Sequence, residues 1–179
     1  MSYTHVQPEV TGPRPDRRAI TGITRLAVLF AAIVAIIAGS LVGSAQPSEA
    51  ATSSSLTTLR AGVVKLTNSA RKAAGCRYGL KVSYRLTRAA QSHANSMARY
   101  NYFSHTSWNG TSWDDRIRHF GWRRPGGENI AYGYSTPLSV VRAWLASPGH
   151  RRNIRNCNFR YIGVGFNTHG NYWVQDFGY

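Results

Sequence analysis

The sequence predicts an α+β fold, in which most helices and strands occupy separate stretches of the chain. Up to about residue 100, apolar side chains recur at helical spacing, and residues 161–179 form two β-rich runs around a short loop at Gly170. A glycine-rich segment typical of a strand and one further helix lie between these parts. Helices and strands therefore do not alternate as they would around a parallel sheet.

Two helices are expected to open the domain, which starts near Leu56. The first ends at Gly75, and its apolar residues recur every three or four positions: Leu59, Val63, Leu66 and Ala70. The second covers residues 82–100 and has an inward face made of Leu86, Ala90, His93 and Met97. We expect His93 to pack in the core rather than to act as a ligand.

Shorter elements follow in the second half of the domain. Residues 114–121 form a short helix closed by its last residue, a glycine, and residues 126–134 suit a turn that runs into a short strand. Pro137 opens a third helix, whose predicted core side is Leu138, Val141 and Leu145. Trp144 and Trp173 are both expected in the core.

The N-terminal part has the layout of an export signal. Residues 1–25 form a basic lead with four arginines, which is expected to stay in the cytoplasm. Residues 26–50 contain 18 uncharged, mainly apolar residues and then small residues that suit cleavage after Ala45 or Ala50. Alternatively this segment remains as a membrane anchor, because a run of that length just spans a bilayer. Both alternatives place residues 51–179 outside the cytoplasm, secreted or on the extracellular face of the envelope.

Two cysteines, Cys76 and Cys157, lie beyond the signal segment. An even number of cysteines in an exported domain indicates a disulfide. Such a bond closes a loop of about 80 residues and stabilises the fold by about 4 kcal/mol in the chain-entropy model. The alternative is a pair of free, buried thiols.

The exported part is strongly basic. Residues 51–179 hold 18 of the 22 lysines and arginines, and the net charge there is +14 because they contain only four acids: Asp114, Asp115, Glu128 and Asp176. This charge favours anionic surroundings such as envelope polymers. The basic residues are scattered and form no recognition-helix or zinc-finger pattern, so specific nucleic-acid binding is not expected. Membrane contact is expected only through the N-terminal segment.

Three polar residues are candidates for chemistry: His105, Glu128 and His150. Two glycines precede Glu128, and a Ser-Pro-Gly sequence stops the helix before His150. Two imidazoles and a carboxylate can bind a divalent ion, or can do acid–base catalysis without one. Their separations of 23 and 22 residues do not match a local metal motif. In the alternatives, Glu128 caps a helix or pairs with an arginine, and the histidines hold loops by hydrogen bonds.

Four motifs occur in an order that is familiar from one protein family: YFSH, R…G…GENIAYG, VVRAWLASPGHRRNI and YIGVGF…YWVQDFG. Together they resemble the CAP superfamily of cysteine-rich secretory proteins, antigen 5 and pathogenesis-related proteins, and most of all its bacterial SCP-like branch. The resemblance covers residues 58–179 and leaves 51–57 as a linker. It implies an α-β-α sandwich with a central antiparallel sheet flanked by helices, and a large open cleft.

The resemblance also assigns the site. Family members place two histidines and two acids in the cleft, and some bind zinc or magnesium there. The histidines map onto His105 and His150 and the first acid maps onto Glu128, so these three are the candidate catalytic residues and metal ligands. Ser147 takes the place of the second acid. Neutral histidines with one carboxylate suit zinc better than magnesium, so zinc is the cofactor to expect, if any.

Three functions are consistent with these observations. The favoured one is a non-enzymatic exported domain that binds a lipid, glycan or peptide in the cleft, which aromatic residues can line: Tyr102, Phe103, Trp108, Trp113, Trp122 and Tyr132. The second is a zinc-dependent hydrolase, in which His105 and His150 hold the metal and Glu128 is a third ligand or the general base. The third is a basic wall-association protein that binds anionic polymers through its charge.

Overall fold

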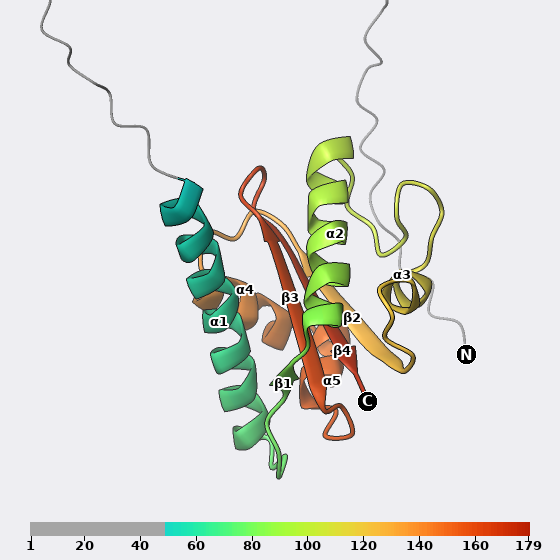
Figure 1. Ribbon diagram of the computed structural model, residues 1–179. Coiled ribbons are helices and arrows are strands. Elements are labelled where there is room, and N and C mark those ends of the chain that lie inside the picture. The colour runs from blue at the N-terminus through green and yellow to red at the C-terminus, as the bar shows by residue number, and fades with distance from the viewer. Residues whose placement is uncertain (1–48) are drawn as a thin grey trace, which may run out of the picture. The chain divides into compact units, whose positions relative to one another are not determined.

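Five helices and four strands make up the part of the chain that the computed structural model describes, residues 49–179 (Figure 1). In chain order they are α1 (Glu49–Ala73), β1 (Lys81–Val82), α2 (Tyr84–Tyr100), α3 (Trp113–His119), β2 (Pro125–Ala131), α4 (Pro137–Ala146), α5 (Pro148–Arg155), β3 (Tyr161–Asn167) and β4 (Tyr172–Gly178). The expected lead, and all but the last two residues of the expected signal or anchor segment, lie outside the described residues. No helix of residues 49–179 combines the length and the apolar character that a membrane crossing requires.

The four strands form one mixed sheet in the order β1-β3-β4-β2. Strands β3 and β4 are the expected antiparallel hairpin, and β2 pairs antiparallel with the other side of β4. Strand β1 is only two residues long and pairs parallel with β3, so the sheet is not wholly antiparallel as the resemblance implies. The sheet places β2, which carries the candidate Glu128, at one edge.

Helices cover both faces of this sheet (Figure 1). Helix α2 lies across β3 and β4, α4 and α5 lie behind the sheet, and α1 packs beside α4, α5 and β3. The contact between α2 and β3 requires two glycines, because a Cβ on Gly163 or Gly165 would overlap the backbone of α2 at Leu86 or Ala90. The predicted α+β fold, with helices flanking a central sheet, is confirmed.

The predicted core is confirmed except on α4. Trp144 and Trp173 are buried as expected, in the cluster between the sheet and helices α1, α4 and α5. The core side of α4 was predicted wrongly, because Leu138 is 46% exposed while Val140 is buried. The buried face of α4 is instead Val140, Val141 and Trp144, and the Trp144 indole N–H donates to the Ile130 carbonyl of β2 at 3.0 Å.

Helix α1 is longer than predicted. Residues 51–57, expected to be a linker, are helical, and Leu56 packs against the edge of the core. This stretch is rich in small residues but contains no glycine or proline that would stop a helix from extending. The predicted C-terminal stop is correct, since Gly75 follows the helix with a φ of +85°.

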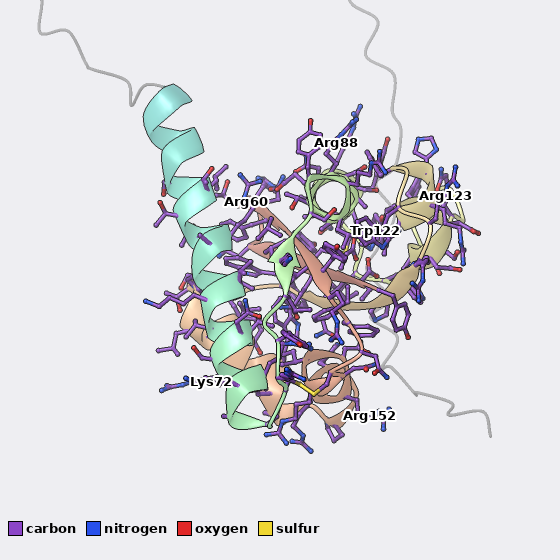
Figure 2. The ribbon with its side chains drawn as sticks, turned by 60° about the horizontal axis from the view of Figure 1, so that its bottom comes forward. Arg60, Lys72, Arg88, Trp122, Arg123 and Arg152 are labelled. Carbon is purple, nitrogen blue, oxygen red and sulfur yellow. A yellow bond between two sulfur atoms is a disulfide. The ribbon has the colours of Figure 1, made fainter. Side chains whose placement is uncertain are left out.

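The predicted disulfide joins Cys76 to Cys157, and the described residues contain no free cysteine. It connects the segment after α1 to the segment after α5, and it appears as a yellow bond in Figure 2. Arg71 of α1 lies in the same region, where its buried guanidinium donates to the carbonyls of Ile154, Asn156 and Phe159. The end of α1 is therefore held to α5 by both covalent and hydrogen bonds.

Candidate functional site

Glu128 lies at the centre of a buried charge cluster. Its side chain is 1% exposed, and each carboxylate oxygen has its own partner: Oε1 lies 2.7 Å from His105 Nδ1, and Oε2 lies 2.5 Å from Arg116 Nη2. Arg116, on α3, is 5% exposed. The alternative in which Glu128 pairs with an arginine therefore describes the geometry, and the same carboxylate also orients His105.

The strand that carries Glu128 is fixed against α5 by two asparagines. Asn153 Nδ2 donates to the Glu128 carbonyl at 3.1 Å and to Asn129 Oδ1 at 2.9 Å. Asn129 Nδ2 in turn donates to the His150 carbonyl at 3.2 Å. Gly127 leaves room for this contact, since a Cβ there would lie 3.1 Å from Asn153 Oδ1. The sequence GGEN thus gives both the space and the amide that hold β2 and α5 together.

His105 lies on the loop between α2 and α3 and is the exposed member of the cluster. Its side chain is 47% exposed, and its Nε2 has no hydrogen-bond partner within residues 49–179. Arg116 also donates to the His105 carbonyl at 3.3 Å and to Ser107 Oγ at 2.5 Å. The preceding residue, Ser104, is held by its carbonyl, which lies 2.8 Å from His93 Nε2. The loop is therefore attached to both neighbouring helices, and Nε2 of His105 is presented to the outside.

Burial and neighbouring charges shift the pKa values of the two acids of the cluster, Glu128 and Asp176, in opposite directions. Burial on its own raises the pKa of Glu128, but the His105 hydrogen bond and the Arg116 charge outweigh it, so the pKa is lowered. Asp176 faces Glu128 across the β2–β4 register and is fully buried. Burial, followed by the charge of Glu128, raises the pKa of Asp176 well above its ordinary value. Glu128 thus stays ionised and Asp176 keeps its proton.

His150 lies within a helix, which differs from the prediction that it leaves a stopped helix. Helix α4 ends at Ala146, but Pro148 is the first residue of α5, where a missing N–H costs nothing, so His150 lies in the first turn of a new helix. The side chain is half-buried. Burial lowers its pKa, and the charge of a protonated His105 lowers it further. His150 is therefore a neutral imidazole at pH 7.

The three candidates do not form a preformed metal site. Within residues 49–179, no group of three or more His, Cys, Asp or Glu side chains is arranged to hold a metal ion. Glu128 has both oxygens engaged by Arg116 and His105, so it is not free to act as a third ligand in this arrangement. The two histidines alone offer fewer donors than a zinc site normally uses.

Three residues of the cluster were not assigned to the site from sequence. Arg116 lies in the quoted R…G…GENIAYG motif, but its separation of 12 residues from Glu128 indicates no contact. Asp176 was noted only as one of four acids. His93 was correctly expected in the core, where it is fully buried, but its link to the His105 loop was not foreseen. A signal was present for Asp176: it lies in a run that is mainly apolar apart from Gln175, and an acid buried in such a strand must be neutral or paired.

The aromatic residues near the site separate into two groups. Trp113 and Trp122 pack against the cluster that joins α2 to α3 and act as core. Three others are exposed: Phe103 at 44%, Trp108 at 66% and Tyr132 at 58%. The rings of Phe103 and Tyr132 lie 5.0 Å apart, and Trp108 stacks on Tyr100 at 5.3 Å. Exposed aromatic residues therefore precede and follow His105 in the chain, at positions 103 and 108.

Comparison with known proteins gives consistent matches. The model of the cysteine-rich secretory protein family, CAP, matches residues 64–177. YkwD of Bacillus subtilis is 41% identical over 125 residues, and the membrane protein YlbC of the same organism is 38% identical over 87. These alignments cover 69% and 48% of this chain, but only 48% of YkwD and 24% of YlbC. The chain thus spans about half or less of these relatives.

Two solved structures resemble the described domain. An extracellular protein from Bacillus anthracis that contains an SCP domain superposes with a TM-score of 0.67 at 28% identity, over 75% of this chain and 45% of that protein. An outer surface protein of Borrelia burgdorferi superposes with a TM-score of 0.58 at 26% identity, over 71% of this chain and 93% of that protein.

Proposed function

Because the chain belongs to the cysteine-rich secretory protein family, we propose that it is an exported binding protein whose His105–Glu128 site receives a ligand without turning it over. The ligand is a lipid, a glycan or a peptide of the envelope or medium. Catalysis is not part of this proposal, because both oxygens of Glu128, the candidate general base, are engaged by His105 and Arg116.

Placement outside the cytoplasm has three kinds of support. The similar solved structures are an extracellular protein and an outer surface protein. The domain contains a disulfide, which persists in oxidising compartments. The sequence before it has the layout of an export signal or an anchor. A retained anchor would put the same domain on the outer face of the membrane.

The observation that carries the proposal is the complete engagement of the Glu128 carboxylate. A general base needs a free oxygen within reach of the proton it abstracts, and both Glu128 oxygens have partners inside a 1% exposed side chain. The bond to His105 Nδ1 instead orients that imidazole and leaves Nε2 exposed. A fixed, half-exposed imidazole beside exposed aromatic rings is suited to hydrogen bonding with a ligand.

The proposal is tested by titrating the ¹⁵N-labelled domain with two probes, a muropeptide digest of bacterial wall and phosphatidylglycerol vesicles. We expect one probe to shift the amide signals of the His105 loop and β2, and we expect His105→Ala to weaken binding by about tenfold, the loss of one hydrogen bond to a fixed partner. His169→Ala is the matched control, since His169 is an exposed histidine in the turn between β3 and β4, away from the His105 loop in the chain. Conversion of the muropeptides by the native domain, abolished by His150→Ala in a folded variant, would overturn a binding-only function.

Zinc-dependent hydrolysis is the second candidate, and the neutral state of His150 is what favours it. A lowered pKa keeps this imidazole available as a ligand at pH 7. Since the cluster lacks a third free donor, we derive no catalytic step from it. Calorimetric titration with zinc chloride near pH 7.5 tests this candidate. One-to-one micromolar binding that is lost in His150→Ala would support a metal site. No binding by the folded domain would exclude zinc-dependent hydrolysis.

A further inference from the structure

We propose that the pocket enclosed by α2, α3 and the loop 104–112 is a carbohydrate-binding site, in which one sugar ring stacks on Trp108. The inference goes beyond the proposed function, because it names a glycan as the ligand of a second site. It concerns a different part of the molecule from the exposed edge of His105, because the pocket lies on the side of the loop that faces α2 and α3.

The pocket has the size of a small-ligand site. Its volume is about 570 Å³, within the range of about 300–1,000 Å³ that such sites occupy. The C-terminal half of α2 forms one wall and α3 forms another, while loop residues from Ser107 to Thr111 close the end. In Figure 1 this loop lies beside the end of α2 and above α3. One or two sugar units fit a space of this volume.

Two exposed aromatic rings provide the surface for a sugar. Trp108 is 66% exposed and Tyr100 is 44% exposed, and their rings are stacked at 5.3 Å with an angle of 10° between the planes. Tyr102 also lies near the indole, with the ring centroids 6.2 Å apart, and the exposed part of the indole is available for a sugar to stack on. The electron-rich face of an aromatic ring attracts the polarised C–H groups of a pyranose. The backbone of Trp108 is also held, since its N–H donates to the Tyr102 hydroxyl at 3.2 Å.

Short polar side chains line the rest of the pocket. Four of them carry hydroxyl groups: Ser92, Ser96, Ser107 and Thr111. Ser96 is oriented by its hydrogen bond with the Tyr102 hydroxyl at 2.8 Å, and Ser107 by its hydrogen bond from Arg116. Ser92 makes no side-chain hydrogen bond within residues 49–179. Hydroxyl groups that both donate and accept are suited to a ligand that itself presents many hydroxyl groups.

A buried histidine at the floor points to a ligand independently. His93 lines the pocket and is fully buried, and its Nδ1 has no hydrogen-bond partner among the described residues. Burial lowers its pKa to about 4, so the ring is neutral. An unsatisfied buried nitrogen costs free energy, which is recovered when a hydrogen-bond donor of an occupant displaces the side chains that cover it.

The charge of the pocket selects an uncharged ligand. The domain has a large basic excess, yet the pocket contains only one arginine and one aspartate. Arg116 is paired with Glu128, and Asp115 lies 3.1 Å from Arg118. By contrast, the groove beside Cys76 contains Lys65, Lys72 and Arg77 with no acid. An anionic polymer would be drawn to that groove, whereas a neutral polyhydroxyl ligand matches the Trp108 pocket.

The test is isothermal titration of the full chain, in a detergent without a sugar headgroup, with a tetrasaccharide of N-acetylglucosamine. We expect binding that Trp108→Ala weakens by about tenfold or more, while Trp108→Phe keeps most of the affinity because a ring remains. Tyr84→Ala is the matched control. Tyr84 is a 75% exposed aromatic residue of α2, the helix that forms one wall of the pocket, but it lies outside the pocket, so its loss should leave the affinity unchanged.

His105→Ala separates this inference from the proposed function. Binding that depends on Trp108 but not on His105 supports the pocket as a glycan site. Binding that depends on His105 and not on Trp108 would overturn the Trp108 site while keeping ligand binding at His105–Glu128. Absence of binding by the native chain would overturn the glycan class, and so would Trp108-dependent binding of a neutral tetrapeptide with no response to the sugar.

Discussion

His93 determines how the site responds to acid, although it does not face the outside. Its Nε2 holds the Ser104 carbonyl beside His105, and its ring lies near Glu128 and Arg116. Burial is the main reason that its pKa falls to about 4 from 6.5. Because the native ring resists protonation, the unfolded chain takes up the proton first as the pH drops. The native state is therefore favoured above pH 6.5 and loses that advantage toward pH 4.

We predict that the free energy of unfolding falls by about 3 kcal/mol between pH 6.5 and pH 4 because of His93 alone. His93→Gln should remove this part of the pH dependence, since glutamine does not titrate and can still donate to the Ser104 carbonyl. Urea unfolding at a series of pH values measures it. His119→Gln, on an exposed histidine, is the control and should leave the slope as in the native chain. If the free energy of unfolding of His93→Gln varied with pH as steeply as that of the native chain, this account would be contradicted.

The buried acids show what residue-level reasoning can and cannot reach. The scarcity of acids singles out Glu128, whereas Asp176 was noted only as one of the four acids, although an acid among the mainly apolar residues of β4 must be neutral or paired. Nothing local, however, indicates that Arg116 supplies the positive charge. Its position depends on how α3 packs against β2, which is a tertiary contact between segments with no shared periodicity.

At the scale of elements, segments with a clear hydrophobic periodicity were predicted correctly, and the errors lie where helices begin and end. The second helix and the final hairpin were predicted because their apolar patterns repeat over many residues. Helix α5 was missed because Pro148 and Gly149 were interpreted only as a stop, although proline is also favourable at the first position of a helix. Ser147, Pro148 and Gly149 therefore lie where α4 ends and α5 begins.

Two glycines of β3 set the distance between α2 and the sheet, and thereby the position of the site. We predict that Gly165→Ala lowers the free energy of unfolding by about 3 kcal/mol, because the new methyl group overlaps the Ala90 carbonyl and a helix backbone cannot move as a side chain can. Thermal unfolding measures the loss. Gly149→Ala is the control, since no atom lies within 4 Å of a Cβ there, and it should be neutral or stabilising. Equal effects of the two substitutions would contradict the packing argument.

At the scale of the whole molecule, the candidate site is assembled from segments that are distant in the chain. His105 comes from a loop, Arg116 from α3, Glu128 from β2, His150 from α5 and Asp176 from β4. No sequence spacing specifies such a cluster: local context singled out His105, Glu128 and His150, and the resemblance to a family then assigned them to one cleft. The structure adds the roles within the cluster, because contacts decide which carboxylate is ionised and which imidazole is exposed.

The excess of lysine and arginine is also a property of the whole molecule, because these residues are spread over its surface. The labelled cations in Figure 2, Arg60, Lys72, Arg88, Arg123 and Arg152, lie around the molecule rather than on one side. Two acids that remain partly or fully exposed, Asp114 and Asp115, are both paired with Arg118. Little negative charge therefore opposes an anionic polymer. The groove with Lys65, Lys72 and Arg77 is a local concentration of this charge.

We predict that the domain binds polyphosphate, used as a model anionic polymer, and that the affinity falls by about 50-fold between about 50 and 200 mM salt if four cations contact phosphate groups. Replacing Lys65, Lys72 and Arg77 by serine should weaken binding more than the same replacement of Arg123, Arg142 and Arg152, which removes equal charge elsewhere. Fluorescence anisotropy at several salt concentrations measures both. Equal losses in the two triple variants would mean that the charge acts as a whole and the groove has no special role, and salt-independent binding would refute the electrostatic mechanism. Trp108→Ala should leave this binding unchanged, because the neutral pocket and the basic groove select different chemistry.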